Sequence, residues 1–214
     1  MNKTKIILII ASSLDGRIAF PNGDGSNFGS IEDRKILSES LSQVDATIFG
    51  SGTLKVHQST FLVKDIFSNL SDKQPISIVA GDLTNFSSEW LYFKQPIKRW
   101  LINSKMVNKK NNLNFDKEFN FKGSWKETLK LLNQEGIISI ALLGGTQLIN
   151  SFIQENLVDE IKITIVPKII GGEYSWIPSF LERDISYSTN NWIIKSLQKL
   201  NTNEIFIHYI RKYS

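Results

Sequence analysis

The chain contains no cysteine among its 214 residues and has only two histidines. The missing cysteines exclude disulfide bonds, thiolate nucleophiles and cysteine-based metal sites. His57 and His208 stand far apart and have no ligand-like spacing, so the sequence does not predict a metal enzyme. No apolar run reaches the roughly 18 residues that a membrane span needs, and we expect no membrane partner.

A strong surplus of one charge is also missing, because the net charge is only +4. Lysine and arginine are scattered, and the only dense runs are Lys109–Lys110 and Arg211–Lys212. This pattern predicts a solvated surface rather than a nucleic-acid interface. The apolar run Ile6–Ala11 is followed at once by Asp15 and Arg17 without a cleavage-like site. It therefore predicts a buried strand rather than a signal peptide, and we expect a cytoplasmic protein.

Continuous apolar runs alternate with segments of helical period. Ser30 with Asp33, and Ser124 with Glu127, have the spacing of a capping box and predict the starts of two helices. Further helical period follows Thr146, while the polar stretch 106–122 predicts a surface excursion. The predicted strands are Lys5–Ala11, Asp45–Phe49, Ile76–Ala80, Arg99–Ile102, Ile137–Leu143 and Asp159–Val166.

The end of the chain differs from the rest, because two strand-like runs meet at a short polar turn. Trp192–Leu200 and Glu204–Arg211 predict an antiparallel hairpin joined by Asn201–Asn203. Neither a repeat nor a linker is visible. Strands alternating with helices, followed by this hairpin, predict one α/β domain with a mixed sheet over residues 1–214.

Two glycine-rich junctions each follow a predicted strand. These are Gly50–Thr53 and Gly144–Gln147. Glycine allows close backbone approach, and the helix that follows offers free N–H groups and a positive dipole end, which together favour phosphate. Neither is a complete GxGxxG or a Walker loop, and each can equally be a tight turn. If both lie at the carboxyl edge of one sheet, they mark a ligand site.

No catalytic constellation is readable between these junctions. None of the serines lies in a GxSxG turn, and both histidines lack an evident partner. Asp15 follows the first strand, where catalytic groups often lie, but Asp15–Gly16 is equally an ordinary turn pair. His57 can likewise be an ordinary loop histidine. The sequence therefore assigns no catalytic residue.

Several segments together resemble one family. They are ASSLDGRIA at 11–19, DATIFGSGT at 45–53, GGT at 144–146, VDE at 158–160 and PKIIGG at 167–172. In this order and spacing the chain resembles the reductase domain of bifunctional riboflavin biosynthesis proteins and its stand-alone relatives. The resemblance implies a dihydrofolate-reductase-like fold, with a central mixed, mostly parallel sheet flanked by helices. It also implies NADPH-dependent reduction of 5-amino-6-(5-phosphoribosylamino)uracil, and a homodimer.

The resemblance assigns cofactor positions throughout the chain. Ala11, Ile18 and Phe28 match residues near the nicotinamide half. Two short runs match the family residues that hold the phosphates and adenosine of the cofactor. They are Ser51, Gly52 and Thr53, and Gly144, Gly145, Thr146, Gln147 and Leu148.

Substrate positions depart from the family pattern. Ser26 matches a phosphate-binding serine, but Ile9, Leu41 and Leu143 stand where the family has lysine, arginine and glutamate. His57 falls within a replaced Asp-Asp-Pro, and Lys64 replaces an arginine, so both become candidate substrate contacts. Three alternatives stay open: a reductase of the riboflavin precursor, a reductase of another small substrate, and a nucleotide-binding module without hydride transfer.

Overall fold

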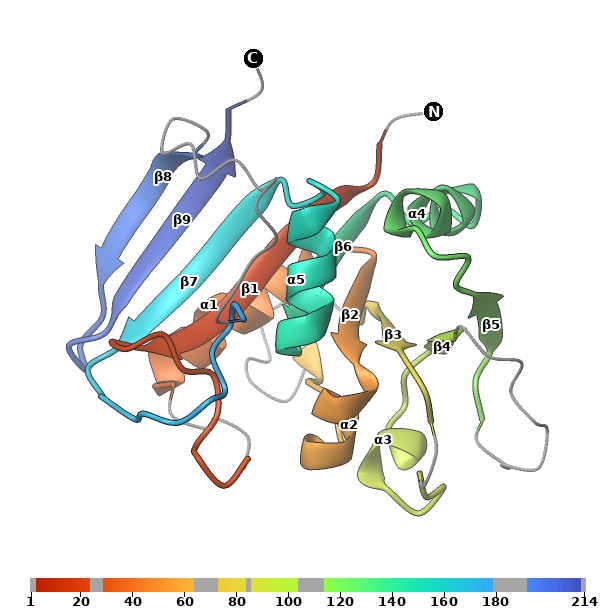
Figure 1. The fold of residues 1–214 in the computed structure, drawn as a ribbon, viewed down its shortest axis with the longest axis horizontal. Helices are drawn as coiled ribbons and strands as arrows, with labels where there is room; N and C mark the ends of the chain where they lie inside the picture. The colour runs from red at the N-terminus through yellow and green to blue at the C-terminus, as the bar shows by residue number, and fades with distance from the viewer. Residues whose placement is uncertain are drawn as a thin grey trace.

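Nine strands form the framework of the molecule. The computed structural model describes residues 3–23, 29–63, 73–83, 86–103, 114–178 and 192–212. The strands are Lys5–Ser13 (β1), Ala46–Gly50 (β2), Ile76–Ala80 (β3), Arg99–Asn103 (β4), Lys117–Asn120 (β5), Ser139–Gly144 (β6), Glu160–Val166 (β7), Trp192–Lys199 (β8) and Ile205–Arg211 (β9). They form a nine-stranded sheet in the order β5-β4-β3-β2-β6-β1-β7-β9-β8 (Figure 1).

The direction of the strands follows the prediction. β1 to β7 pair in parallel throughout, whereas β9 runs antiparallel to both β7 and β8. The predicted mixed, mostly parallel sheet and its C-terminal antiparallel hairpin are therefore confirmed. The loop between β8 and β9 contains the predicted turn Asn201–Asn203. Within it, Asn203 adopts the left-handed conformation with φ 60°.

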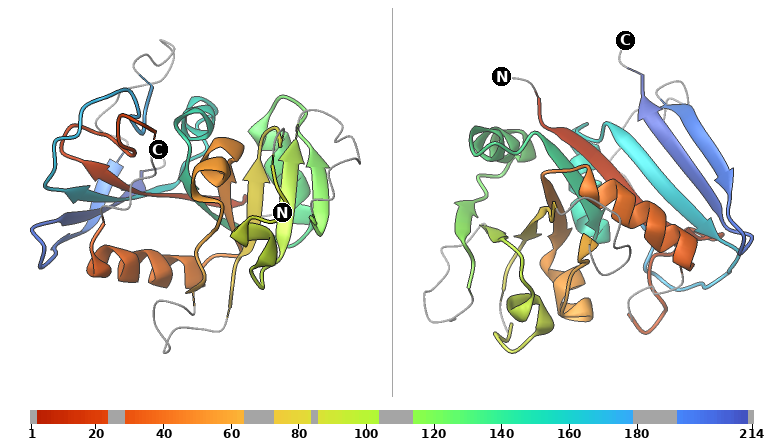
Figure 2. Two further views of the ribbon diagram at one scale, coloured as in Figure 1. Left: turned by 90° about the horizontal axis from the view of Figure 1, so that it is seen from below. Right: turned by 180° about the vertical axis from the view of Figure 1, so that it is seen from behind.

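Helices cover both faces of the sheet. They are Ile31–Ser42 (α1), Ser51–His57 (α2), Leu91–Lys94 (α3), Trp125–Gln134 (α4) and Thr146–Gln154 (α5). α4 and α5 pack on one face, where the largest apolar cluster lies, and α5 stands in front of the sheet in Figure 1. α1 crosses the opposite face, as the right view of Figure 2 shows, and α2 and α3 pack on that face beside it.

Burial on both faces explains the continuous apolar runs. Successive strand residues point to opposite faces, and in β1 the side chains of Ile6, Leu8 and Ile10 join the cluster under α4 and α5. Ile7 and Ile9 point the other way and pack beneath α1. A strand covered on both sides therefore needs apolar residues at every position, and this made the central strands readable from the sequence.

The two predicted helix caps differ in outcome. Ser30 caps α1 as expected, because its hydroxyl accepts the Asp33 N–H at 3.1 Å. Ser124 is the N-cap residue of α4 as predicted, but its side chain makes no capping hydrogen bond, so the capping box with Glu127 is not formed. Glu155, from the end of α5, accepts the N–H of Trp125 at 2.7 Å and of Lys126 at 3.0 Å. A carboxylate distant in sequence thus replaces the local one at this helix start.

The polar stretch predicted as a surface excursion contains a strand. β5 pairs in parallel with β4, and its Phe119 ring packs against Trp100 in a tilted arrangement with a centroid distance of 5.4 Å. Only one of its four residues is apolar, so the segment carries no period-2 signal. Residues 104–113 of the same stretch lie outside the described residues.

Candidate active site

The two glycine junctions lie side by side. β2 and β6 are parallel neighbours, so the turns at Gly50 and Gly145 leave the sheet at the same edge. A Cβ placed on Gly145 would lie 3.3 Å from Thr53 Oγ1 and 3.7 Å from the Gly50 nitrogen. The starts of α2 and α5 therefore meet at the carboxyl edge of the sheet, where parallel α/β folds bind ligands.

Glycine is required at the second junction by its backbone. Gly144 has φ 135° and Gly145 has φ 89°, values that side-chain-bearing residues rarely adopt. By contrast, a Cβ on Gly50 or Gly52 would meet nothing within 4 Å, so these glycines face open space. The close approach at Gly145 and the open space at Gly50 together form a cradle that suits a phosphate group above the first turn of α5.

The end of β1 is tied to the strap formed by residues 167–178. The Asp15 carboxylate accepts the Ser13 hydroxyl at 2.6 Å, the Ile170 N–H at 3.0 Å and the Gly171 N–H at 2.7 Å. These donors, with the Ser13 hydroxyl first, hold the pKa of the Asp15 carboxyl far below its usual range. Asp15 therefore stays ionised and fastens the strap, which resolves its role in favour of structure over proton transfer.

The strap also reaches the start of α5. Thr146 donates its hydroxyl to the Ser175 carbonyl at 2.5 Å, and Ile18 donates its N–H to the Tyr174 carbonyl at 2.8 Å. The loop that carries Ile18 and the turn that carries Thr146 are thus held by one segment. This brings two parts of the predicted cofactor site together, although the Thr146 hydroxyl already has a partner.

The predicted residues fall into four groups. Those that share the carboxyl edge are Ala11 at the end of β1, Ile18, the run Ser51, Gly52 and Thr53, and the run from Gly144 to Gln147. Leu148 lies in the apolar core beneath α5, so its side chain cannot face a ligand. His57 is exposed at the far end of α2. Ser26, Phe28 and Lys64 lie outside the described residues.

The three departures from the family pattern pack into a single apolar cluster. Ile9 and Leu41 belong to its buried core, and Leu143 packs against it from the end of β6. Leu41 is only 1% exposed. The members of this apolar cluster are Ile7, Ile9, Leu41, Val44, Val63 and Ala141, with Leu37 and Leu143 at its margin. Lys162 of β7 lies beside it, paired with Ile9 and donating its Nζ to the Ser40 hydroxyl at 2.9 Å. The three positions therefore lie together on the α1 side of the sheet.

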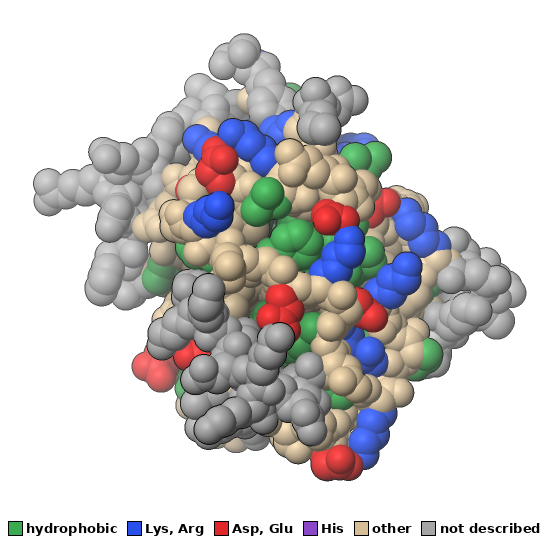
Figure 3. Space-filling model, turned by 90° about the vertical axis from the view of Figure 1, so that its right-hand side faces the viewer, with side chains coloured by type: hydrophobic (Ala, Val, Ile, Leu, Met, Phe, Trp, Pro, Cys, Tyr) green, Lys and Arg blue, Asp and Glu red, His purple; other side chains and the backbone are tan. Residues whose placement is uncertain are grey.

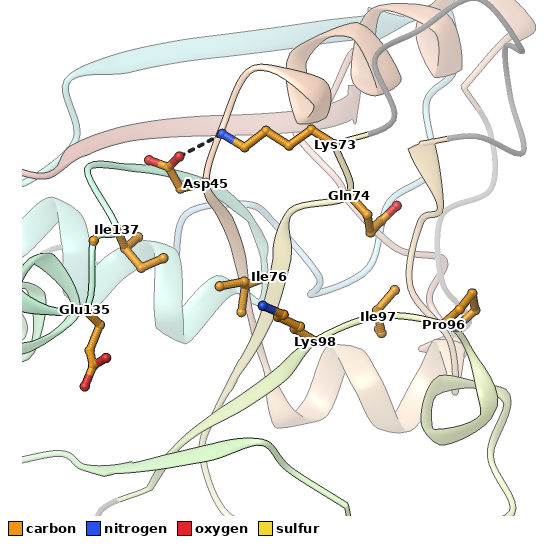
Figure 4. Close-up of a pocket in the computed structure, with 10 residues that line it drawn as sticks. Asp45, Lys73, Gln74, Ile76, Pro96, Ile97, Lys98, Glu135 and Ile137 are labelled. Carbon is orange, nitrogen blue, oxygen red and sulfur yellow. Dashed lines mark hydrogen bonds and ion pairs between the residues drawn. The ribbon is translucent and has the colours of Figure 1, made fainter.

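A hollow lies at the opposite edge of the sheet. It has a volume of about 390 Å³ and is lined from the amino ends of the strands (Figure 4). Its Asp45 carboxylate accepts Lys73 Nζ at 2.9 Å and the Ser139 N–H and hydroxyl at 3.0 and 2.8 Å. With these donors in place the carboxylate serves the fold, and we assign no ligand to this hollow.

Two other classes of site gain no support. Within the described ranges, there is no group of three or more histidine, cysteine or acidic residues that could hold a metal ion, and no helix is long and apolar enough to cross a membrane. On the face drawn in Figure 3, lysine and arginine are interspersed with acidic side chains. This view shows no basic stripe of the kind that binds a nucleic-acid backbone.

Known proteins resemble the chain over most of its length. It is 27% identical over 185 residues to the riboflavin biosynthesis protein RibD of Buchnera aphidicola, covering 78% of this chain and 49% of that protein. It is 25% identical over 205 residues to the 2,5-diamino-6-ribosylamino-4(3H)-pyrimidinone 5′-phosphate reductase of Debaryomyces hansenii, covering 80% and 78%. The chain thus spans about half of the first relative and most of the second.

Solved structures share the fold at low identity. The deaminase/5-amino-6-(5-phosphoribosylamino)uracil reductase of Thermotoga maritima aligns with a TM-score of 0.80 at 17% identity, over 98% of this chain and 57% of that one. The dihydrofolate reductase of Enterococcus faecalis aligns with a TM-score of 0.59 at 13% identity, over 98% and 97%. The expected dihydrofolate-reductase-like fold is therefore confirmed. A model of the RibD C-terminal domain matches residues 4–202, and the chain belongs to the RibD C-terminal domain family.

Proposed function

We propose that the chain is an NADPH-dependent reductase that transfers hydride to a small substrate. The observation that carries the proposal is the contact between the glycine turns at Gly50 and Gly145, which forms a cradle at the carboxyl edge of the sheet. Three relatives are named 2,5-diamino-6-ribosylamino-4(3H)-pyrimidinone 5′-phosphate reductases, which supports a reductase. We take residues 1–214 as one reductase domain and expect it in the cytoplasm.

Different residues at the carboxyl edge of the sheet would contact different parts of the cofactor. Ser51–Thr53 and Gly144–Gln147 would hold the phosphates, and Leu148 could contribute only its backbone. Ala11 and Ile18, with Phe28, would border the nicotinamide. When bound, this cofactor supplies the hydride, while the protein orients the acceptor and excludes water. The preference for NADPH over NADH comes from the resemblance, and Ser26, His57 and Lys64 stay candidate substrate contacts.

Two measurements test this function in sequence. Calorimetry should show NADPH binding, and no heat at about 1 mM would contradict a specific cofactor site. NADPH oxidation with the pyrimidinone phosphate and a panel of small carbonyl and imine compounds then separates an enzyme from a binding module. Binding without oxidation of NADPH by any compound would favour the second alternative, a nucleotide-binding module.

The apolar cluster bears on which substrate is reduced. Leu143 directly precedes Gly144 and is only partly buried, so it borders the cradle. Neither it nor Ile9 and Leu41 beside it can hydrogen-bond a sugar or pair with a phosphate, and unpaired buried hydroxyls cost about 1–3 kcal/mol each. We therefore favour a substrate other than the ribosylaminopyrimidine phosphate of the relatives, with an uncharged part against this cluster.

We further propose a homodimer formed through the open part of the sheet. No described helix lies in front of β7, β9 and β8 in Figure 1, and these strands carry three rows of apolar residues across this face. Ile194 is 52% exposed, Leu197 60% and Ile205 41%. The rows are Ile161–Tyr209–Ile194, Ile163–Ile207–Leu197 and Ile165–Ile205, the last of which ends at Lys199 of β8. Two such flat faces can stack at about 10 Å.

Substitution on the two faces of β8 tests this dimer. Light scattering should give twice the chain mass of 24.4 kDa for the unmodified protein. Leu197→Lys should give the monomer mass, because the charge would be desolvated in the interface. Gln198→Lys is the matched control, since Gln198 pairs with Phe206 and points to the other face. A monomeric unmodified protein, or equal behaviour of both variants, would contradict this surface.

A further inference from the structure

Another hollow lies between α1 and the outer strands β7, β9 and β8, with a volume of about 160 Å³. In the right view of Figure 2, α1 crosses this face of the sheet, and β9 and β8 lie to one side of it. The helix lines the hollow with Ile36, Ser40 and Gln43, which recur at helical spacing. A different flank of α1, with Leu37 and Leu41, packs on the apolar cluster. The hollow is therefore separate from that cluster.

A row of polar residues crosses the sheet beneath this hollow. Lys162, His208 and Ser196 are register partners in β7, β9 and β8, so their side chains lie on one face. The register of β8 shifts next to Ser196, which makes Lys195 the extra residue of a bulge. Burial lowers the pKa of both Lys162 and His208, and the charge of Lys195 lowers both further. Lys195 therefore lies close enough to add positive charge to the hollow.

Lys162 reaches the hollow without a counter-ion. Its Nζ donates to the Ser40 hydroxyl at 2.9 Å. The Glu160 carboxylate on the same face is already engaged, because Lys5 Nζ lies 2.5 Å from Oε1 and His208 Nε2 lies 2.8 Å from Oε2. Among the residues that the structure describes, no carboxylate lies within ion-pair distance of Lys162 Nζ. An ammonium has three donors, so two of them are available to a ligand.

Burial makes this charge costly to hold. Burial lowers the pKa of Lys162, although Glu160 and Glu39 both act in the opposite direction. An anion in the hollow would supply the missing opposite charge and replace lost water contacts. The hollow has room for about five water molecules at about 30 Å³ each. Pockets for drug-sized ligands reach about 300 Å³ or more, so a ligand here must be compact.

We propose that this hollow binds a compact oxyanion of the phosphate or carboxylate class. Lys162 Nζ would donate its two remaining hydrogen atoms to the anion, in charge-assisted bonds. Gln43 and Gln198 line the walls with amide groups that can donate as well. Lys195 would add attraction from the rim. This site does not depend on the proposed reductase function, because it lies apart from the glycine turns that form the cofactor cradle.

The two histidines of the chain provide a direct readout of where an anion binds. His208 lines the hollow, whereas His57 is exposed at the far end of α2. In protein labelled with ¹³C-histidine, the two ring signals are assigned by the loss of one in His57→Gln. Inorganic phosphate, and malonate in parallel, are added at constant pH and ionic strength against sodium chloride. At about 10 mM, at least one of the two should move the His208 signal saturably and leave His57 in place. A His208 signal that follows neither anion, or equal movement of both signals, would overturn the proposal.

Charge changes inside and outside the hollow test the role of Lys162. Lys162→Met should weaken the anion affinity at least about tenfold, because it removes a charged donor. Its NADPH affinity should stay unchanged. Lys130→Met is the matched control, since it removes the same charge from the exposed surface of α4. Unchanged anion affinity in Lys162→Met, or an equal loss in the control, would contradict the site.

A second pair of variants tests the same point if Lys162→Met does not fold. Gln43→Glu places a carboxylate in the hollow, three residues along α1 from Ser40. It would occupy the place of the anion beside Lys162 and should likewise weaken the affinity at least about tenfold. Gln134→Glu makes the same substitution at the end of α4 and should leave the affinity unchanged. Equal anion affinity in these two variants would overturn the proposal.

Discussion

Replacing Gly145 by alanine is expected to weaken NADPH binding at least about tenfold, which corresponds to about 1.4 kcal/mol. The new Cβ would lie 3.3 Å from Thr53 Oγ1, a contact so tight that the Thr53 hydroxyl in the other glycine turn must shift. The backbone adds to the effect, because φ 89° is a left-handed conformation that costs a residue with a Cβ about 1–2 kcal/mol. Calorimetry with NADPH measures the first effect and denaturant unfolding the second.

Gly136 provides a matched control for this substitution. It has φ 88°, nearly the same as Gly145, but a Cβ there would meet nothing within 4 Å. It also lies at the amino-terminal edge of the sheet, in the lining of the opposite hollow. Gly136→Ala should therefore lose similar stability and keep its NADPH affinity. Equal affinity in both variants would mean that the turn at Gly145 does not hold the cofactor.

Features that depend on local sequence were predictable from the sequence. The central strands could be recognised because both faces are covered and every position is apolar. The convergence of Gly50 and Gly145 was only a condition at the sequence level, because it depends on β2 and β6 being parallel neighbours, which the structure shows. In the structure Gly144 and Gly145 both have a positive φ, which explains why glycine stands at these two positions.

Features that depend on distant partners could not be predicted. Glu155 caps α4 from 30 residues away, whereas Glu127, which has the expected spacing, instead pairs with Lys130 on the surface. Asp33 presented only as a residue of a helix cap, because its partners Thr164 and Glu204 come from the far end of the chain. The local sequence around a carboxylate in the first turn of a helix does not predict which strand residues will lie next to it.

The three departures from the family pattern illustrate the same point. Considered singly along the chain, Ile9, Leu41 and Leu143 are three lost polar contacts. In the structure they contribute to one cluster on the α1 side of the sheet. The three apolar residues therefore belong to one packed region, beside the edge that carries the two glycine turns.

Leu41→Arg is expected to reduce the free energy of unfolding by about 3–5 kcal/mol, because it places an unpaired charge among apolar side chains. Leu41 is 1% exposed and packs with Ile7 and Ile9, while the Glu160 carboxylate that β7 brings to the same face already pairs with Lys5 and His208. Denaturant unfolding measures the loss. Leu91→Arg is the control, since Leu91 is 58% exposed and the same substitution there should be nearly neutral.

A second charge distinguishes a packed cluster from a latent polar pocket. Leu143→Glu combined with Leu41→Arg should recover part of the lost stability, because both side chains belong to one cluster and the double-mutant coupling should reach about 0.5–3 kcal/mol. If Leu41→Arg instead folds as stably as the unmodified protein and binds inorganic phosphate, the cluster opens readily to polar groups. The ribosylaminopyrimidine phosphate would then become the favoured substrate, because a single arginine at position 41 would be enough to bind its phosphate.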